Sequence, residues 1–113
     1  MSMIKTSAIL VAVALAAAPN LALAGSVGCS AAWGDGFCHT DNISANSQFH
    51  FVHVDVSGPC DLFTVVDRVN GITVYQSSSG WGGHERTIGG LYSAYSVYLY
   101  GGSWPFTSVT LAN

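Results

Sequence analysis

The sequence predicts an all-β protein, a small single-domain antiparallel Greek-key sandwich of about seven strands. Apolar residues run in short groups with a period of two, and Gly, Ser, Asn and Asp interrupt them about every eight to twelve positions. No stretch sustains the period of a helix. Together these patterns are typical of two packed antiparallel sheets. The expected strands lie near residues 26–33, 47–57, 61–69, 72–78, 84–88, 94–100 and 106–112.

The first residues are typical of a secretory signal peptide. Lys5 precedes an apolar run over residues 8–18, and residues 22–24 read Ala-Leu-Ala, the small-residue pattern of a cleavage site. The run is too short to span a bilayer, which needs about 20 apolar residues. We therefore expect residues 1–24 to be removed and residues 25–113 to form one secreted, extracellular domain, with no membrane insertion after cleavage.

The expected mature chain is acidic. Loss of Lys5 takes the formal net charge from −3 to −4 and leaves Arg68 and Arg86 as its basic residues. Affinity for nucleic acid depends on clustered Lys and Arg that neutralise phosphates, and attraction to an anionic membrane needs the same residues. The composition therefore argues against a nucleic-acid partner and against a membrane-surface partner.

The clearest local signal is Asn70-Gly71, which joins two runs rich in β-branched residues. Both central residues of a type I′ turn need φ > 0, and Asn-Gly adopts it at little cost. A two-residue loop pairs Val69 with Ile72 and puts both on the core face. Asp67 interrupts that face near the turn, where its carboxylate is expected to accept backbone N–H bonds.

That register sorts the remaining side chains of the hairpin between two faces. The core face is the more apolar one and includes Phe63 and Val65. The other face carries Arg68 and Tyr75 and is expected to be the outer one.

The segment "AYSVYLY" at 94–100 predicts a strand with two kinds of tyrosine. Alternation places Tyr95 on the core face, and it places Tyr98 and Tyr100 on the opposite face. The longer pattern "TIGGLYSAYSVYL" resembles the tyrosine corner of Greek-key sandwiches, which implies that Tyr95 hydrogen-bonds back across the preceding turn and that Leu91 is buried. Tyr98 and Tyr100 are free for recognition unless a further layer covers them.

Three cysteines, Cys29, Cys38 and Cys60, lie in the exported part, where thiols oxidise. An odd number allows at most one bridge within the chain. A hairpin at residues 34–36 brings Cys38 and Cys60 to the same end of the sheet, and this is the favoured pair. If residues 34–46 form one long loop, Cys29 lies nearer Cys60 or closes with Cys38. The remaining thiol is expected to be buried as a small hydrophobe, with an intermolecular disulfide as the alternative.

Metal binding and catalysis find little support. In "FHFVHVDV" alternation sends His50 and His53 to opposite sides, so the two imidazoles cannot chelate one ion together, although His53 and Asp55 share a face. No spacing matches a zinc or copper signature, and no nucleophile elbow, Cys-His motif or carboxylate pair is recognisable. We expect no metal site, no cofactor and no enzymatic activity.

The remaining candidate feature is a set of three tryptophans. Trp33, Trp81 and Trp104 all lie beside glycines at expected loop tips. Each tryptophan either covers an open end of the sandwich or contacts a partner, and at least one is expected to be a contact. The candidate binding residues are Trp81, Tyr98, Tyr100 and Trp104.

These observations predict a small secreted, non-enzymatic recognition protein, similar in kind to toxins, inhibitors and effectors, that binds an extracellular protein through aromatic loop residues. The alternative is a module that binds carbohydrate or cell wall through exposed Trp and Tyr. A row of rings on one sheet face favours a sugar, whereas a protruding cluster of loops favours a protein groove. A weaker alternative is self-assembly through a poorly guarded sheet edge.

Overall fold

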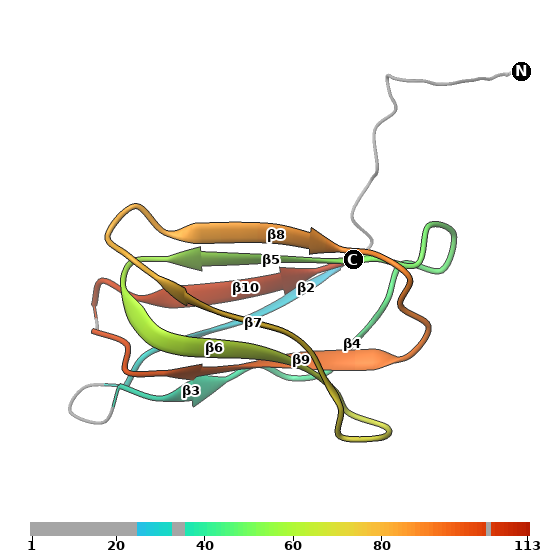
Figure 1. Cartoon of the computed structure of the whole chain (residues 1–113), viewed down its shortest axis with the longest axis horizontal. Helices are drawn as coiled ribbons and strands as arrows, with labels where there is room; N and C mark the ends of the chain where they lie inside the picture. The colour runs from blue at the N-terminus through green and yellow to red at the C-terminus, as the bar shows by residue number, and fades with distance from the viewer. Residues whose placement is uncertain (1–24, 33–35, 104) are drawn as a thin grey trace, which may run out of the picture.

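The computed structural model describes residues 25–32, 36–103 and 105–113, and these residues are all-β without a helix (Figure 1). Accordingly, none of them belongs to a helix that could cross a membrane. The strands are β2 (Ser26–Ser30), β3 (Cys38–His39), β4 (Ile43–Ser44), β5 (Val52–Ser57), β6 (Cys60–Asp67), β7 (Thr73–Ser79), β8 (His84–Ile88), β9 (Ala94–Tyr100) and β10 (Ser108–Ala112).

The strands form two antiparallel sheets that lie as two layers in Figure 1. One sheet has the order β2-β10-β5-β8, and the other has the order β3-β9-β6-β7 with β4 also paired to β9. The all-β prediction is confirmed, and the bounds expected for β8 and β9 match those observed. The Greek-key connectivity stays a prediction. The predicted signal peptide, residues 1–24, lies outside the described residues and stays a prediction too.

The core is made by alternate residues of both sheets. Val52, Val54 and Val56 of β5 are buried, and Val97 and Leu99 of β9 pack on the same core. Full burial of one such side chain contributes about 1.5–3 kcal/mol. Because successive strand residues point to opposite faces, burial of this set turns the neighbours of each residue outward. The other buried members of the core are Ala31, Cys60, Phe63, Val65, Leu91, Tyr95, Val109 and Leu111.

The tyrosine-corner prediction is confirmed. The Tyr95 ring is 3% exposed, and its hydroxyl oxygen accepts hydrogen bonds from the N–H groups of Tyr92 at 3.3 Å and Ser93 at 3.2 Å. Leu91 is buried beside it. Tyr95 therefore anchors the loop that leads into β9.

Strand β5 begins later than the sequence predicts, at Val52 instead of residue 47. The Asn46 side-chain oxygen accepts hydrogen bonds from the N–H groups of Gln48 and Phe49. These bonds stabilise a turn where the sequence predicts a strand. His50 closes this turn with a φ of 56°, in the left-handed region. The alternation expected from residue 47 is therefore interrupted before Val52.

The hairpin between β6 and β7 is wider than the predicted two-residue type I′ turn. The Asp67 N–H donates to the Ile72 carbonyl and the Gly71 N–H donates to the Asp67 carbonyl, both at 2.8 Å, so four residues form the loop. Gly71 alone in this loop has a positive φ, of 79°. Val69 and Ile72, predicted in the core, are instead 79% and 59% exposed at the hairpin tip. The predicted register was wrong.

A second difference, a β-bulge, moves Tyr75 to the inner side of its sheet. A β-bulge between Val65 and Val66 places Tyr75 opposite the buried Val65. The Tyr75 ring packs against Phe63 with 6.0 Å between ring centroids. A single extra residue in one strand reverses the face of every side chain beyond it. The alternation in the sequence is the same with or without such a bulge, so it could not reveal this reversal.

The disulfide joins Cys29 to Cys38, which corrects the favoured prediction of Cys38 with Cys60. Cys29 lies on β2, at one edge of its sheet, and Cys38 lies on β3, at an edge of the other sheet. The two Cα atoms are 6.0 Å apart, so the bond joins the two layers. Cys60 is free and buried at the start of β6, as the prediction of a leftover hydrophobic thiol expects.

Replacement of Tyr95 by Phe tests the anchor of β9. Loss of the hydroxyl removes two part-buried hydrogen bonds, so we expect the free energy of unfolding to fall by about 1–3 kcal/mol. Urea denaturation followed by tryptophan fluorescence measures this change. Tyr92→Phe is the matched control, since Tyr92 is 78% exposed. Equal stability of the two variants would contradict the anchoring role of Tyr95.

Removal of the disulfide tests the link between the layers. We expect the double variant Cys29→Ser, Cys38→Ser to lose about 2–3 kcal/mol of stability in urea, because its unfolded chain is less constrained. Cys60→Ala keeps the disulfide and serves as the control. Peptide mapping of the oxidised protein should recover Cys29 bonded to Cys38, and a peptide that links Cys38 to Cys60 would contradict the structure.

Candidate binding site

The outer face of the β3-β9-β6-β7 sheet carries a groove of about 490 Å³. This volume falls within the roughly 300–1,000 Å³ common for ligand sites. Its floor forms because Phe63 and Val65 of β6 are buried, which turns the alternate residues Leu62, Thr64 and Val66 to the outside. The groove is lined by Leu62, Thr64, Val66, Arg68, Gly71, Thr73, Tyr98 and Tyr100.

Four rings lie along one side of the groove, and we call Phe37, His39, Tyr98 and Tyr100 the aromatic row. His39 stacks on Tyr98 with 5.3 Å between centroids and 22° between planes. Phe37 lies 5.3 Å from Tyr100 and 6.5 Å from Tyr98. Phe37 is 36% exposed and Tyr100 41% exposed. The row thus presents ring surface beside the groove.

The short segment 37–39, which includes β3, supplies half of the aromatic row because Cys38 is held by the disulfide. Cys38 pairs with Leu99 and His39 pairs with Tyr98 in the ladder between β3 and β9. Cys38 is directed inward to its bond with Cys29, so alternation directs Phe37 and His39 outward. The disulfide therefore positions two of the four rings.

Arg68 lies at the groove beside Tyr98 and is held by several groups. Its backbone N–H donates to the Ala94 carbonyl at 2.8 Å. Its Nη1 donates to the Tyr98 hydroxyl at 2.7 Å and lies 3.2 Å from the Ser96 hydroxyl. The guanidinium carbon lies 5.5 Å from the centre of the Tyr98 ring, within the range of a cation–π contact. These contacts orient a positive charge at the groove.

Asp67 fixes the backbone of the loop that carries Arg68. Its Oδ1 accepts from the N–H of Val69 at 2.8 Å, from the Ser93 hydroxyl at 2.9 Å and from the N–H of Asn70 at 3.3 Å. Burial acts to raise the pKa of the Asp67 carboxyl, but these three hydrogen bonds outweigh it and hold the pKa below its usual value. The predicted turn-capping role of Asp67 is confirmed.

The structure brings together two of the four predicted binding residues. Tyr98 and Tyr100 share the aromatic row, as alternation predicts. Trp81 lies apart from the lining residues, at the tip of the β7–β8 hairpin. Trp104 and Trp33 lie outside the described residues.

Trp81 is 73% exposed, so it does not cover an end of the sandwich. Its ring meets Phe106 of the β9–β10 loop edge-on, with 5.7 Å between centroids and 70° between planes. Phe106 is itself 60% exposed. In Figure 1 the β7–β8 hairpin and the β9–β10 loop lie at the same end of the sandwich. The two rings form a separate, protruding aromatic pair.

Sequence reasoning missed Phe37 and His39. A signal was present in "FCHT", where two rings alternate with Cys38 and Thr40. It was obscured because the strand is only two residues long and the pairing of Cys38 was not known. Arg68 was placed correctly on the outer face, although the details of its hairpin were wrong.

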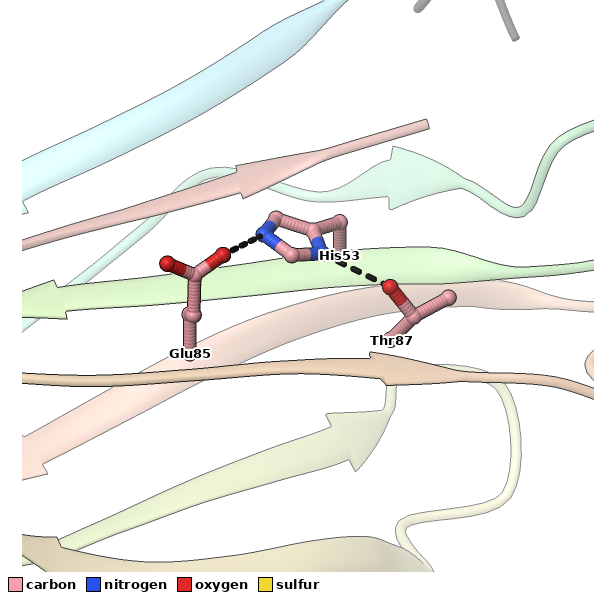
Figure 2. Close-up of polar contacts among 3 residues, drawn as sticks. All are labelled: His53, Glu85 and Thr87. Carbon is pink, nitrogen blue, oxygen red and sulfur yellow. Dashed lines mark hydrogen bonds and ion pairs between the residues drawn. The ribbon is translucent and has the colours of Figure 1, made fainter.

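The outer face of the other sheet carries a polar cluster, drawn in Figure 2. His53 lies between two neighbours on β8: its Nδ1 is 2.8 Å from the Thr87 hydroxyl and its Nε2 is 3.2 Å from a Glu85 carboxylate oxygen. Both ring nitrogens of His53 are therefore engaged. The arrangement of a hydroxyl, an imidazole and a carboxylate has the chemical order of a catalytic triad.

Solvent exposure weakens this cluster as a catalytic unit. The Glu85 side chain is 70% exposed and that of His53 is 29% exposed, so water screens the pair. Catalysis of this type relies on a water-poor site with fixed oxyanion donors, and the groove lies on the opposite sheet. Among the described residues, no group of three or more His, Cys, Asp or Glu is placed to hold a metal.

The open edge of the sandwich between β7 and β8 is closed by aromatic and polar groups. The Tyr75 hydroxyl lies 2.8 Å from His84 Nε2, and the Arg86 guanidinium lies 5.3 Å from the centre of the Tyr75 ring. The His84 ring also packs on Phe63, at 5.4 Å. Arg86, the second cation of residues 25–113, thus serves the fold at this edge and does not line the groove.

No known protein family, curated protein or solved structure matches this chain.

Acid denaturation of Asp67→Asn tests how the groove loop is held. Because the folded pKa of Asp67 lies below its unfolded value of about 3.9, its ionised form stabilises the fold above about pH 4. That stabilisation is lost as the pH falls through the folded pKa. We expect Asp67→Asn to be less stable than the native chain at pH 7, with the difference narrowing below pH 4.

Urea unfolding between about pH 7 and pH 2 measures this difference. Asp41→Asn is the charge-matched control, because Asp41 is exposed and lies outside this turn. A gap between native chain and Asp67→Asn that does not change with pH would contradict the role of the ionised carboxylate.

Proposed function

We propose that this chain is a small exported recognition protein that binds a macromolecular partner and catalyses no reaction. The observation that carries the proposal is the groove on the outer face of the β3-β9-β6-β7 sheet, where the aromatic row lies beside an oriented Arg68. Exposed rings beside an oriented polar group are typical of recognition surfaces. Export through residues 1–24 is part of the proposal, and the disulfide is compatible with an extracellular location.

The arrangement of the rings favours a glycan as the partner. The aromatic row lies along one sheet face, and its members come from β9 and from the short segment through β3. The faces of such rings carry partial negative charge and attract the C–H groups of a sugar ring. Hydroxyl and guanidinium groups in the groove, from Thr64, Thr73 and Arg68, are available to hydrogen-bond sugar hydroxyls.

A protein partner is the second candidate, and a different observation favours it. Trp81 and Phe106 protrude from two loops at one end of the sandwich, and large exposed aromatic side chains dominate the energy of many protein interfaces. In this alternative the loop pair, and not the groove, forms the centre of the interface.

Retention on insoluble polysaccharides tests the proposal. The protein, expressed with its own leader and purified after processing, is incubated with cellulose, chitin and cell-wall material, and in parallel with a panel of secreted proteases and glycosidases. We expect retention on at least one polysaccharide. Tyr98→Ala and Tyr100→Ala should weaken retention by roughly tenfold, since each removes a stacking ring.

Tyr92→Ala is the matched control, because Tyr92 is an exposed tyrosine that does not line the groove. Unchanged retention in the groove variants, with loss in Trp81→Ala, would move the binding site to the loop pair. Inhibition of an enzyme without polysaccharide retention would support the protein partner. Turnover of any substrate by the purified protein would contradict a purely binding role.

A further inference from the structure

Arg68 is an unusual residue to find in this groove. Residues 25–113 contain two arginines and no lysine against six carboxylates, so the chain as a whole repels anions. Arg86 stacks on Tyr75 at the sandwich edge. The other arginine lies at the groove, next to the aromatic row, where it is the local positive charge.

The guanidinium of Arg68 is only partly used by the protein. Its Nη1 is bonded to Tyr98 and Ser96, whereas Nε and Nη2 make no hydrogen bond with the part of the chain that the structure describes. Within the same part, no carboxylate forms an ion pair with Arg68. The side chain is exposed. A held guanidinium with two free nitrogens is suited to grip a carboxylate in fork geometry.

We propose that the groove recognises an acidic glycan, in which one sugar ring stacks on Tyr98 or Tyr100 and its carboxylate is bound by Arg68. This inference rests on the proposed function and specifies its partner. The shared chemistry is a sugar carboxylate, as found in uronic acids and sialic acids. Because the rest of the chain is acidic, the selectivity comes from Arg68 itself and not from a broad positive field.

An acidic peptide fits the groove less well than a sugar. Peptides commonly bind sheets by adding a strand to a free edge, which supplies backbone hydrogen bonds. The groove floor is β6, whose backbone is already paired with β7 on one side and β9 on the other. A peptide laid over this face would lose solvation of its backbone without gaining these partners. A sugar has no such backbone and uses ring faces and hydroxyls.

Titration calorimetry of the processed protein against matched polymers tests the proposal. The probes are polygalacturonate and the same polymer fully methyl-esterified, and, separately, a sialylated glycan and its desialylated form. We expect the acidic member of at least one pair to bind roughly 10- to 100-fold more tightly than its neutral counterpart, the range for a charge-assisted hydrogen-bonded contact. The pair that shows this preference identifies the source of the carboxylate.

Variants of the two arginines provide the decisive comparison. Arg68→Gln should lower affinity for the acidic member to that for the neutral one, and Arg68→Lys should recover only part of the loss because the fork is missing. Arg86→Gln removes the same charge away from the groove and should leave the preference intact. Thermal unfolding of all three variants confirms that they fold.

The outcomes separate this inference from the function on which it rests. Equal affinity for acidic and neutral members, or an equal loss in Arg86→Gln, would overturn the acidic-glycan inference but leave glycan binding standing. Absence of binding to every glycan, including the insoluble ones, would overturn both. Arg68-dependent binding of a poly-glutamate peptide that exceeds binding of the acidic glycans would also overturn the choice of a sugar.

Discussion

Burial of one face of β9 is the constraint on which the rest of this structure depends. Tyr95, Val97 and Leu99 enter the core between the two sheets, and the Tyr95 hydroxyl ties the preceding loop to the start of the strand. Since a strand has only two faces, this burial leaves Tyr98 and Tyr100 on the outside. The core and the candidate binding surface are thus two consequences of the same alternation.

Asp67 couples the hairpin to β9 and thereby completes the groove. Its carboxylate binds two N–H groups of its own turn and the Ser93 hydroxyl, which immediately precedes β9. Arg68, the next residue, then reaches across β9 to Ser96 and Tyr98. An oriented side chain loses less conformational entropy when a ligand binds, so contacts within the fold prepare the surface for recognition.

The disulfide acts at the opposite side of the same sheet. The bond from Cys29 to Cys38 fixes β3 beside β9. Phe37 and His39 flank Cys38 in the chain, so their rings are fixed at the same place. In a domain of this size, where the core is small, one covalent link contributes a sizeable part of the net stability. Here it also sets the position of Phe37 and His39, so the stability of the edge and the continuity of the aromatic row depend on one bond.

The sequence by itself determined the all-β class, most of the strands, the anchoring role of Tyr95 and the outward direction of Tyr98 and Tyr100, because these follow from local periodicity and from turn residues. Only the tertiary structure decided which cysteines pair, that Phe37 and His39 join the tyrosines, and that Val69 and Ile72 are exposed. The first two features depend on how edges of the separate sheets meet, and the third depends on the four-residue hairpin loop. The bulge between Val65 and Val66 additionally turns Tyr75 inward. Such long-range contacts and register shifts leave no periodic signal in the chain. A shift of one residue keeps the alternation of apolar and polar residues and changes only which set faces the core.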